Sequence, residues 1–303
     1  DAVVIDLDDP LAEAQLSARG GHLILISSGL LTAMRFYSAT FACETAARSQ
    51  ETRDSCLAVL RFYHLQQDYF GLSAVHAPAR LPRTVWRDSE ILASMFVLAH
   101  EIAHHALHHT SGGEAWSPDQ ELEADRWAGR LVRSNPLSIV VTKGRQERSL
   151  RGIYVALTVL TGRESARFLR APSPHPSLSE RWGAATDGAK NASGVWADSG
   201  TLRSLASAAD RMHDPLPASH WSALRESRLW RGHLRDPGVY EAAAVLDALN
   251  AAPLALVFDV AEGLRALDGD SPVGVVLERV CDAFRSPRSL VGSLRDCGVS
   301  VLT

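Results

Sequence analysis

The stretch His100-Glu101-Ile102-Ala103-His104 constrains the fold more than any other part of the sequence. Its two histidines stand four residues apart. Side chains at that spacing lie on one face of an α-helix, so both imidazoles can reach a single metal ion if the segment is helical. Glu101 is rotated by roughly 100° from His100, at 3.6 residues per turn, so its carboxylate flanks the metal and can face a bound water. Because the motif also occurs by chance, the surrounding sequence has to support this interpretation.

The residues around the motif predict the helix that it requires. Apolar residues recur at helical spacing along the segment. Asp88 or Ser89 is expected to cap the start of the helix, which runs to about His109 and ends before Gly112-Gly113. The end of the helix holds three more histidines, His105, His108 and His109. They could be extra ligands or a metal-loading patch, but polar residues at a helix end are the simpler explanation.

The next helix has a clear start signal. Ser117 is expected at the N-cap, Pro118 at the first helical position and Gln120 where a capping box needs it. This helix carries Glu121 and ends at about Arg133. Because only a short loop joins the two helices, Glu121 lies close enough in sequence to supply a third metal ligand.

Two acidic residues one turn apart, Glu121 and Asp125, give this second helix its expected role. A catalytic zinc takes three protein ligands and keeps one position for water, and Glu121 completes such a set with His100 and His104. Asp125 lies on the same face and can accept the outer N–H of a ligand histidine, which fixes the orientation of that imidazole. Two alternatives stay open. The carboxylates are simply acidic residues at a helix start, where the dipole favours them, or Glu123 is the ligand in place of Glu121.

This donor set predicts one Zn²⁺ per chain and hydrolytic chemistry. Zinc lowers the pKa of its bound water to near 7, and Glu101 takes the proton as that water attacks a carbonyl. The related pattern with a third histidine is absent, because Leu107 and Thr110 occupy its last two positions. The sequence therefore indicates a metal centre of two histidines and a carboxylate.

Three stretches carry a resemblance to a known family. They are residues 97–104 (VLAHEIAH) followed by 121–125 (ELEAD), residues 20–31 (GGHLILISSGLL), and residues 175–181 (HPSLSER). With these stretches the sequence resembles the gluzincin peptidases, and most specifically the HtpX and CAAX-prenyl-protease family. It is also similar to the ImmA/IrrE-type regulatory peptidases, which imply the same metal ligands but have no His-Pro motif.

The resemblance implies roles for residues outside the two helices. In the family, the residues that match His175 and Arg181 lie near the metal and help the transition state or gate the site. His175 then has two expected roles, a donor to the oxyanion or a fourth zinc ligand that keeps the enzyme latent. The stretch 20–31 is similar to the family's edge strand. If it is an edge strand, its open backbone can pair with an extended substrate through the residues His22, Leu23, Ile24 and Leu25.

The predicted fold class is α+β and predominantly helical, a zincin-like domain with a small N-terminal sheet. Strands are expected at residues 2–5 and 22–26, with a polar helix-like piece between them. A helical pattern covers residues 32–69, and another helix is expected at 147–169.

The catalytic domain is expected to span residues 1–186 and to contain an insertion at about 32–88, as a lid or a partner-binding segment. Residues 187–200 are small and polar, which favours a linker or a surface loop. The C-terminal region, residues 201–303, carries no recognisable chemistry. Its expected helices lie at about 201–211, 218–231, 237–250 and 254–267.

Composition limits the partners and the location. The formal net charge is -4 and the arginines are scattered, so neither nucleic acid nor anionic lipid is an expected partner. The longest apolar runs fall far short of the roughly 20 residues that a membrane span needs, and no signal peptide opens the chain. The four cysteines are expected to be free thiols in a reducing compartment. Two disulfides remain as alternatives, Cys43–Cys56 and Cys281–Cys297. We therefore expect a soluble, cytoplasmic protein.

The leading hypothesis is a zinc-dependent endopeptidase that acts on a protein or peptide. Its rival is a zinc-binding regulatory or interaction module without turnover. Glu101 favours the enzyme, because a purely structural zinc site has no use for a base there and fills its fourth position with protein. A third hypothesis is a latent peptidase, opened or held closed by a protein partner.

Overall fold

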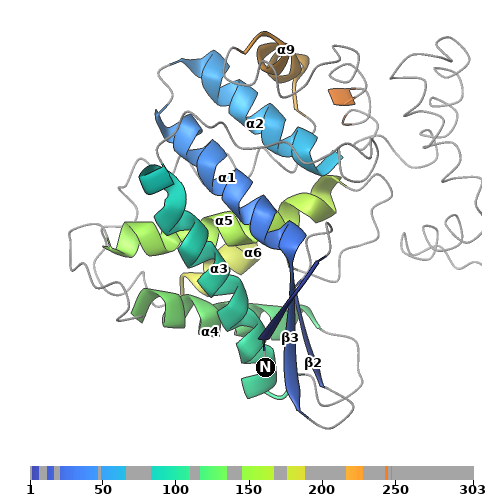
Figure 1. Cartoon of the computed structure of the whole chain (residues 1–303), viewed down its shortest axis with the longest axis vertical. Helices are drawn as coiled ribbons and strands as arrows, with labels where there is room; N and C mark the ends of the chain where they lie inside the picture. The colour runs from blue at the N-terminus through green and yellow to red at the C-terminus, as the bar shows by residue number, and fades with distance from the viewer. Residues whose placement is uncertain are drawn as a thin grey trace, which may run out of the picture. The chain divides into compact units, whose positions relative to one another are not determined.

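The computed structural model describes residues 2–6, 12–16, 21–46, 49–65, 83–109, 117–134, 145–166, 176–187, 216–227, 243–244 and 247. The chain divides into two compact units, which we describe separately. Unit 1 comprises Asp1–Ala42, Ala79–Thr161 and Pro174–Ala209; unit 2 comprises Cys43–Pro78, Gly162–Ser173 and Asp210–Thr303. The described elements are mainly helical with a small sheet near the N-terminus (Figure 1), which confirms the predicted fold class.

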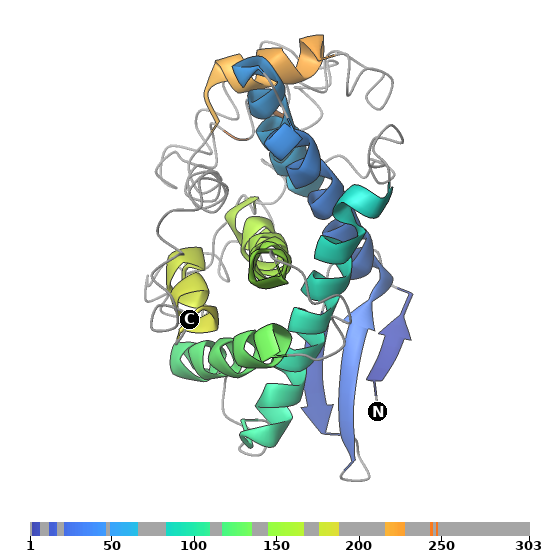
Figure 2. The same cartoon turned by 90° about the vertical axis from the view of Figure 1, so that its left-hand side faces the viewer.

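The sheet of unit 1 has three strands, β1 (Ala2–Ile5), β2 (Ala12–Leu16) and β3 (His22–Ser27), in the order β1-β3-β2 (Figure 2). β1 runs parallel to β3 and β2 runs antiparallel to it. The prediction of a helix-like piece between the first and last strands is wrong, because β2 lies there. Its sequence AEAQL alternates small or apolar residues with polar ones, which is the two-residue period of a strand with one buried face.

The prediction that β3 is an edge strand is also wrong. Its backbone pairs with β1 from Ile24 to Ser27 and with β2 from His22 to Ile26, so β3 is the central strand. The continuous apolar run Leu23–Ile26 is typical of such a strand, which has neighbours on both sides and is well covered. Of the four residues expected to bind substrate through an open edge, Ile24 and Leu25 are therefore paired on both sides, whereas His22 and Leu23 pair with β2.

The helices of unit 1 surround the predicted motif. α1 (Ser28–Ala46, mostly in unit 1) follows β3 directly, and the others are α3 (Arg83–Ala106), α4 (Pro118–Ser134), α5 (Arg145–Ala166, mostly in unit 1) and α6 (Leu178–Ala185). α3 begins earlier than the caps Asp88 and Ser89 predict. Residues 83–87 contain no glycine or proline, and Trp86 is buried, so packing extends the helix backwards.

Two glycines allow the helices of unit 1 to approach closely. A Cβ on Gly152 of α5 would collide with Leu92 of α3, and a Cβ on Gly129 of α4 would collide with the carbonyl of Ala185 in α6. Since α4 also packs against α3, the three helices α3, α4 and α6 form one tightly packed group. This group positions the site described below.

Unit 2 contains α2 (Gln50–Leu65), which packs against α9 (Ala218–Glu226). The single helical pattern predicted over residues 32–69 is therefore two helices, α1 and α2. Ser49 accounts for the new start, because its hydroxyl accepts the Thr52 N–H as a helix cap (3.2 Å). α9 matches the start of the helix predicted at 218–231 and ends earlier.

Cys43 and Cys56 are buried free thiols, as predicted, and burial raises the pKa of Cys43 to about 11. Cys281 and Cys297 lie outside the described residues. So do the predicted helices at 201–211 and 254–267, most of the helix at 237–250 and nearly all of the linker at 187–200. Among the described helices, none has the length and apolar character that crossing a bilayer would require.

Candidate metal centre

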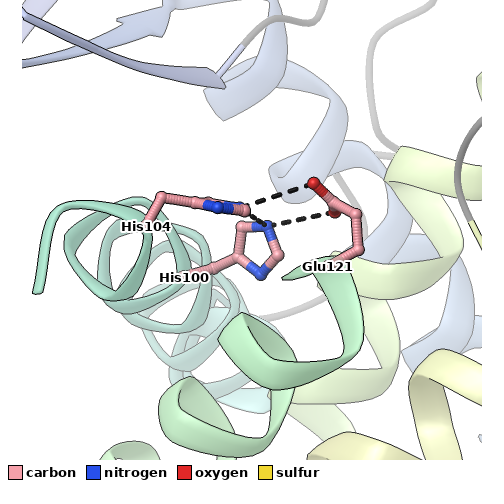
Figure 3. Close-up of side chains that lie close together, drawn as sticks. All are labelled: His100, His104 and Glu121. Atoms are coloured by element: carbon pink, nitrogen blue, oxygen red, sulfur yellow. Dashed lines mark hydrogen bonds and ion pairs between the residues drawn. The ribbon is translucent and has the colours of Figure 1, made fainter. Parts of the chain in front are cut away.

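α3 and α4 bring together the three residues predicted as metal ligands, His100, His104 and Glu121 (Figure 3). The two Nε2 atoms are 3.1 Å apart. Glu121 Oε2 lies 3.3 Å from His100 Nε2, and Glu121 Oε1 lies 3.4 Å from His104 Nε2. All three side chains are buried. The two histidines share a face of α3 because they are four residues apart.

The start of α4 places Glu121 at this point. Ser117 and Gln120 form the predicted capping box: the Gln120 N–H donates to Ser117 Oγ (3.3 Å), and the Ser117 N–H donates to the Gln120 side chain (3.0 Å). The Glu121 N–H then donates to the Ser117 carbonyl (3.2 Å) in the first helical turn. The cap thus fixes where the helix begins, and the start of the helix fixes where the Glu121 carboxylate points.

The arrangement fits a bound cation. A neutral imidazole carries one N–H and one lone pair, and the outer nitrogens of both histidines already face partners. His100 Nδ1 lies 2.9 Å from Asp125 Oδ1, and His104 Nδ1 lies 3.1 Å from His109 Nδ1. With their protons on these outer nitrogens, both Nε2 atoms present lone pairs to one point beside a carboxylate. Three converging acceptors repel one another unless a positive charge lies between them, so the group can hold a metal ion.

The pKa of His100 shows the same demand for positive charge. Burial by itself lowers the pKa of His100, but the carboxylates of Asp125 and Glu121 outweigh it and raise the pKa to about 10. Burial lowers the pKa of His104.

A buried ion pair behind His100 holds Asp125 in position. Arg181 donates from Nε to Asp125 Oδ2 (2.8 Å) and from Nη2 to Asp125 Oδ1 (3.0 Å), a bidentate contact, and its Nη2 lies 3.4 Å from Glu121 Oε2. Burial alone would raise the pKa of Asp125, but Arg181 and His100 overcome this effect and hold that pKa below its ordinary value. Arg181 thus contacts two carboxylates of the site from behind.

α6, which carries Arg181, is absent from the helices predicted above. Its start signal is present in the sequence, because Ser177 and Glu180 form a second capping box. The close approach at Gly129 then brings α6 onto α4, so that Arg181 reaches Asp125.

Glu101 is buried beside the ligands, and within the described part of the chain its Oε2 has no hydrogen-bond partner. Burial is the main cause that raises its pKa to about 7. The charge of His100 opposes this rise, and the charges of Glu121 and Glu13 add to it. Glu13 lies on β2, and its proximity to the site escaped prediction because β2 itself did; the alternation in AEAQL is the signal that would have shown the strand.

Other predicted site residues lie elsewhere. Glu123, the alternative ligand, is exposed and does not belong to the group that can hold a metal. His105 lies against β3: its Nδ1 is 3.0 Å from His22 Nδ1, and its Nε2 is 3.0 Å from the Leu23 carbonyl oxygen. His175 lies outside the described residues, so its predicted roles stay predictions.

The comparisons with known proteins point to a peptidase. Residues 83–196 match the family model Peptidase U49. The chain is similar to a peptidase family. The matched segment begins with α3, continues past α6 and contains His100, His104 and Glu121, so the match supports a peptidase function. Neither the curated proteins nor the solved structures contain a match. The finer assignments to the HtpX and CAAX-prenyl-protease family or to the ImmA/IrrE type gain no support from these comparisons.

Proposed function

We propose that the chain is a zinc-dependent endopeptidase in which His100, His104 and Glu121 hold one zinc ion and Glu101 is the general base. The observation that carries the proposal is the convergence of two imidazole Nε2 atoms, 3.1 Å apart, and one carboxylate on a single buried point. Two histidines, one carboxylate and an adjacent glutamate are the donor set of hydrolytic zinc sites. The Peptidase U49 match lies over the same residues.

Zinc bound here would lower the pKa of a water molecule and polarise the scissile carbonyl. Glu101 supplies the proton chemistry. Its carboxylate lies beside the ligands, where it can accept a proton from the attacking water and return it to the leaving amine. Its Oε2, which has no hydrogen-bond partner among the described residues, leaves an oxygen for that purpose.

Asp125 and Arg181 position the ligands rather than react. Asp125 Oδ1 lies 2.9 Å from the outer nitrogen of His100, and the bidentate contact from Arg181 holds the Asp125 carboxylate in place. This role differs from the transition-state or gating role that the family resemblance implies for Arg181. His175 remains the candidate for an oxyanion donor or for the fourth ligand of a latent form that a protein partner opens.

An extended substrate would add to β2 rather than to β3. β2 is an edge of the described sheet, and it lies against α3, the helix that carries the ligands. Strand addition needs an unpaired backbone edge beside the reacting groups, and β3 is paired on both sides from Ile24 to Ile26. The substrate class on this proposal is a protein or peptide in extended conformation.

Glu101→Gln tests the proposal. The substitution keeps the size and polarity of the side chain but removes the base, so zinc content should stay at one per chain while cleavage of a peptide library falls about 10²–10⁴-fold. Zinc is measured by elemental analysis and cleavage by mass spectrometry. Zinc binding without any cleavage by the wild type would favour the regulatory module without turnover. Full cleavage by Glu101→Gln would refute the assigned base.

A further inference from the structure

The end of α3 places a third histidine, His109, against the ligand His104. Their Nδ1 atoms are 3.1 Å apart, and their ring centroids are 5.2 Å apart. His109 contacts the outer nitrogen of His104, on the opposite side of the ring from the Nε2 atom that faces His100 and Glu121. His109 is therefore not one of the group that can hold the metal.

The termination of the helix builds this contact. The His109 N–H donates to the His104 carbonyl (2.9 Å) and the His108 N–H donates to the His105 carbonyl (3.2 Å), which is the hydrogen-bond pattern of a Schellman motif. The motif requires a left-handed residue at its corner, and His108 adopts it with φ 60°. The chain then reverses over the last turn of the helix, so that the side chain of His109 returns to His104.

The hydrogen-bonding capacity of the two rings sets a direction. A metal-bound His104 uses its Nε2 lone pair for the metal, so its proton is on Nδ1 and donates to His109. His109 must accept at Nδ1, which leaves its proton on Nε2. That atom lies 3.3 Å from Glu123 Oε2. Each ring thus has one tautomer that satisfies these contacts.

We propose that His109 is a positioning residue for the metal ligand His104, and that Glu123 orients His109. This inference rests on the proposed metal site. It assigns a role to two side chains that the sequence suggests only as a polar helix end and an alternative ligand. The structure thereby supports each ligand histidine from behind: His100 by Asp125, and His104 by His109. Groups that hold the outer nitrogen of a ligand imidazole typically contribute about 10–100-fold to metal affinity or activity.

The two members of the His109–Glu123 pair should contribute differently to metal affinity. The side chain of His109 is 6% exposed, whereas that of Glu123 is 56% exposed. Water competes for the Glu123 carboxylate and screens its charge. Loss of Glu123 should therefore weaken metal binding much less than loss of His109.

The test is zinc affinity of the full chain, measured by competition with a chromophoric chelator, for a pair of matched variants. The side-chain oxygen of His109→Asn can occupy the place of Nδ1 and accept from His104, whereas that of His109→Gln lies at the place of Nε2 and cannot. We expect His109→Gln and His109→Ala to lose about 10-fold or more in zinc affinity, and His109→Asn to recover most of that loss. Thermal unfolding of the metal-free variants detects a merely structural role of His109. Such a role would lower the unfolding temperature of His109→Asn, His109→Gln and His109→Ala alike.

Glu123→Ala tests the second link. It should reduce zinc affinity only when His109 is present, so the double variant His109→Ala/Glu123→Ala should match His109→Ala alone. Asp119→Ala is the control, because it removes another exposed acidic residue from the same helix.

The outcomes separate this inference from the proposed function. Wild-type protein that binds no zinc overturns both. Wild-type protein that binds zinc, with unchanged affinity in His109→Ala, overturns the role of His109 alone. Equal losses in His109→Asn and His109→Gln also overturn it. If Glu123→Ala and Asp119→Ala lose equal zinc affinity, Glu123 acts only through its general negative charge and its proposed role is overturned.

Discussion

The two units each bury charged groups, but they bury them in opposite ways. In unit 2, Arg61 Nε donates to Asp247 Oδ1 at 2.6 Å, and Asp247 Oδ2 accepts the Leu216 N–H at 2.7 Å. One cation meets one anion, and both oxygens of the anion have donors. In the metal centre of unit 1, Arg181 contacts the Glu121 carboxylate from behind, and two imidazole nitrogens still converge with that carboxylate on one point.

This difference teaches that burial of charge does not by itself identify a functional site. A complementary pair is complete within the protein and contributes to the structure of its own unit. Acceptors that converge on one point leave a deficit of positive charge, which a proton or a metal ion has to supply. The variants below test whether the two regions differ in this way.

The largest effect is expected from removal of a ligand. His104→Ala leaves the site with two donors, so zinc affinity should fall by more than the roughly 100-fold that loss of an outer partner costs. Chelator competition measures it. The control His108→Gly removes a histidine from the same helix end at a position where glycine suits the φ of 60°. Full zinc occupancy in both His104→Ala and Glu121→Ala would show that the ligands are misassigned.

Disruption of the Arg61–Asp247 pair in unit 2 should lower the free energy of unfolding and leave metal binding unchanged. Arg61→Met leaves the buried Asp247 carboxylate without its cation, and removal of one partner from a buried ion pair costs about 3–5 kcal/mol. Urea unfolding measures the loss, while zinc affinity should not change. The double variant Arg61→Met/Asp247→Asn removes both charges, keeps an acceptor for the Leu216 N–H and should recover much of the stability. A drop in zinc affinity in Arg61→Met would break the comparison.

A smaller effect is expected at Asp125, which belongs to both kinds of cluster. It pairs with Arg181 as Asp247 pairs with Arg61, and it also orients a ligand. Asp125→Ala should lower zinc affinity about 10–100-fold, less than His104→Ala does. Arg126→Ala, at the next and exposed position of α4, is the control. An equal loss in Asp125→Ala and His104→Ala would make Asp125 a ligand or a determinant of folding.

The smallest effect is expected for an exposed ion pair. Arg35 Nε lies 2.9 Å from Glu90 Oε1, but the Arg35 side chain is 54% exposed, so solvent screens the attraction. Arg35→Ala should change the free energy of unfolding by less than about 1 kcal/mol and should leave zinc affinity unchanged. Unfolding curves at low and high salt measure it. A loss as large as that of Arg61→Met would show that burial does not separate these two pairs.

Much of the site could be predicted because its signals are local. The four-residue spacing of His100 and His104 acts through one helix, and the cap at Ser117 acts within one turn, so neither depends on distant parts of the chain. The family resemblance implied that Arg181 lies near the metal. It did not predict that Arg181 contacts Asp125, 56 positions away in the sequence. The helix that carries Arg181 also has a local start signal, the capping box at Ser177.

The sequence by itself determined the two helices that carry the site, and the carboxylate and two histidines that converge there, because the α-helical period and the capping residues are properties of short segments. Tertiary structure decided the rest. It made β3 a central strand by pairing it with β1 and β2. It also turned the chain at His108 so that His109 meets His104. Strand order and a reversal at a helix end depend on which hydrogen-bonding groups and packing surfaces meet across the fold, and short-range patterns do not contain that information.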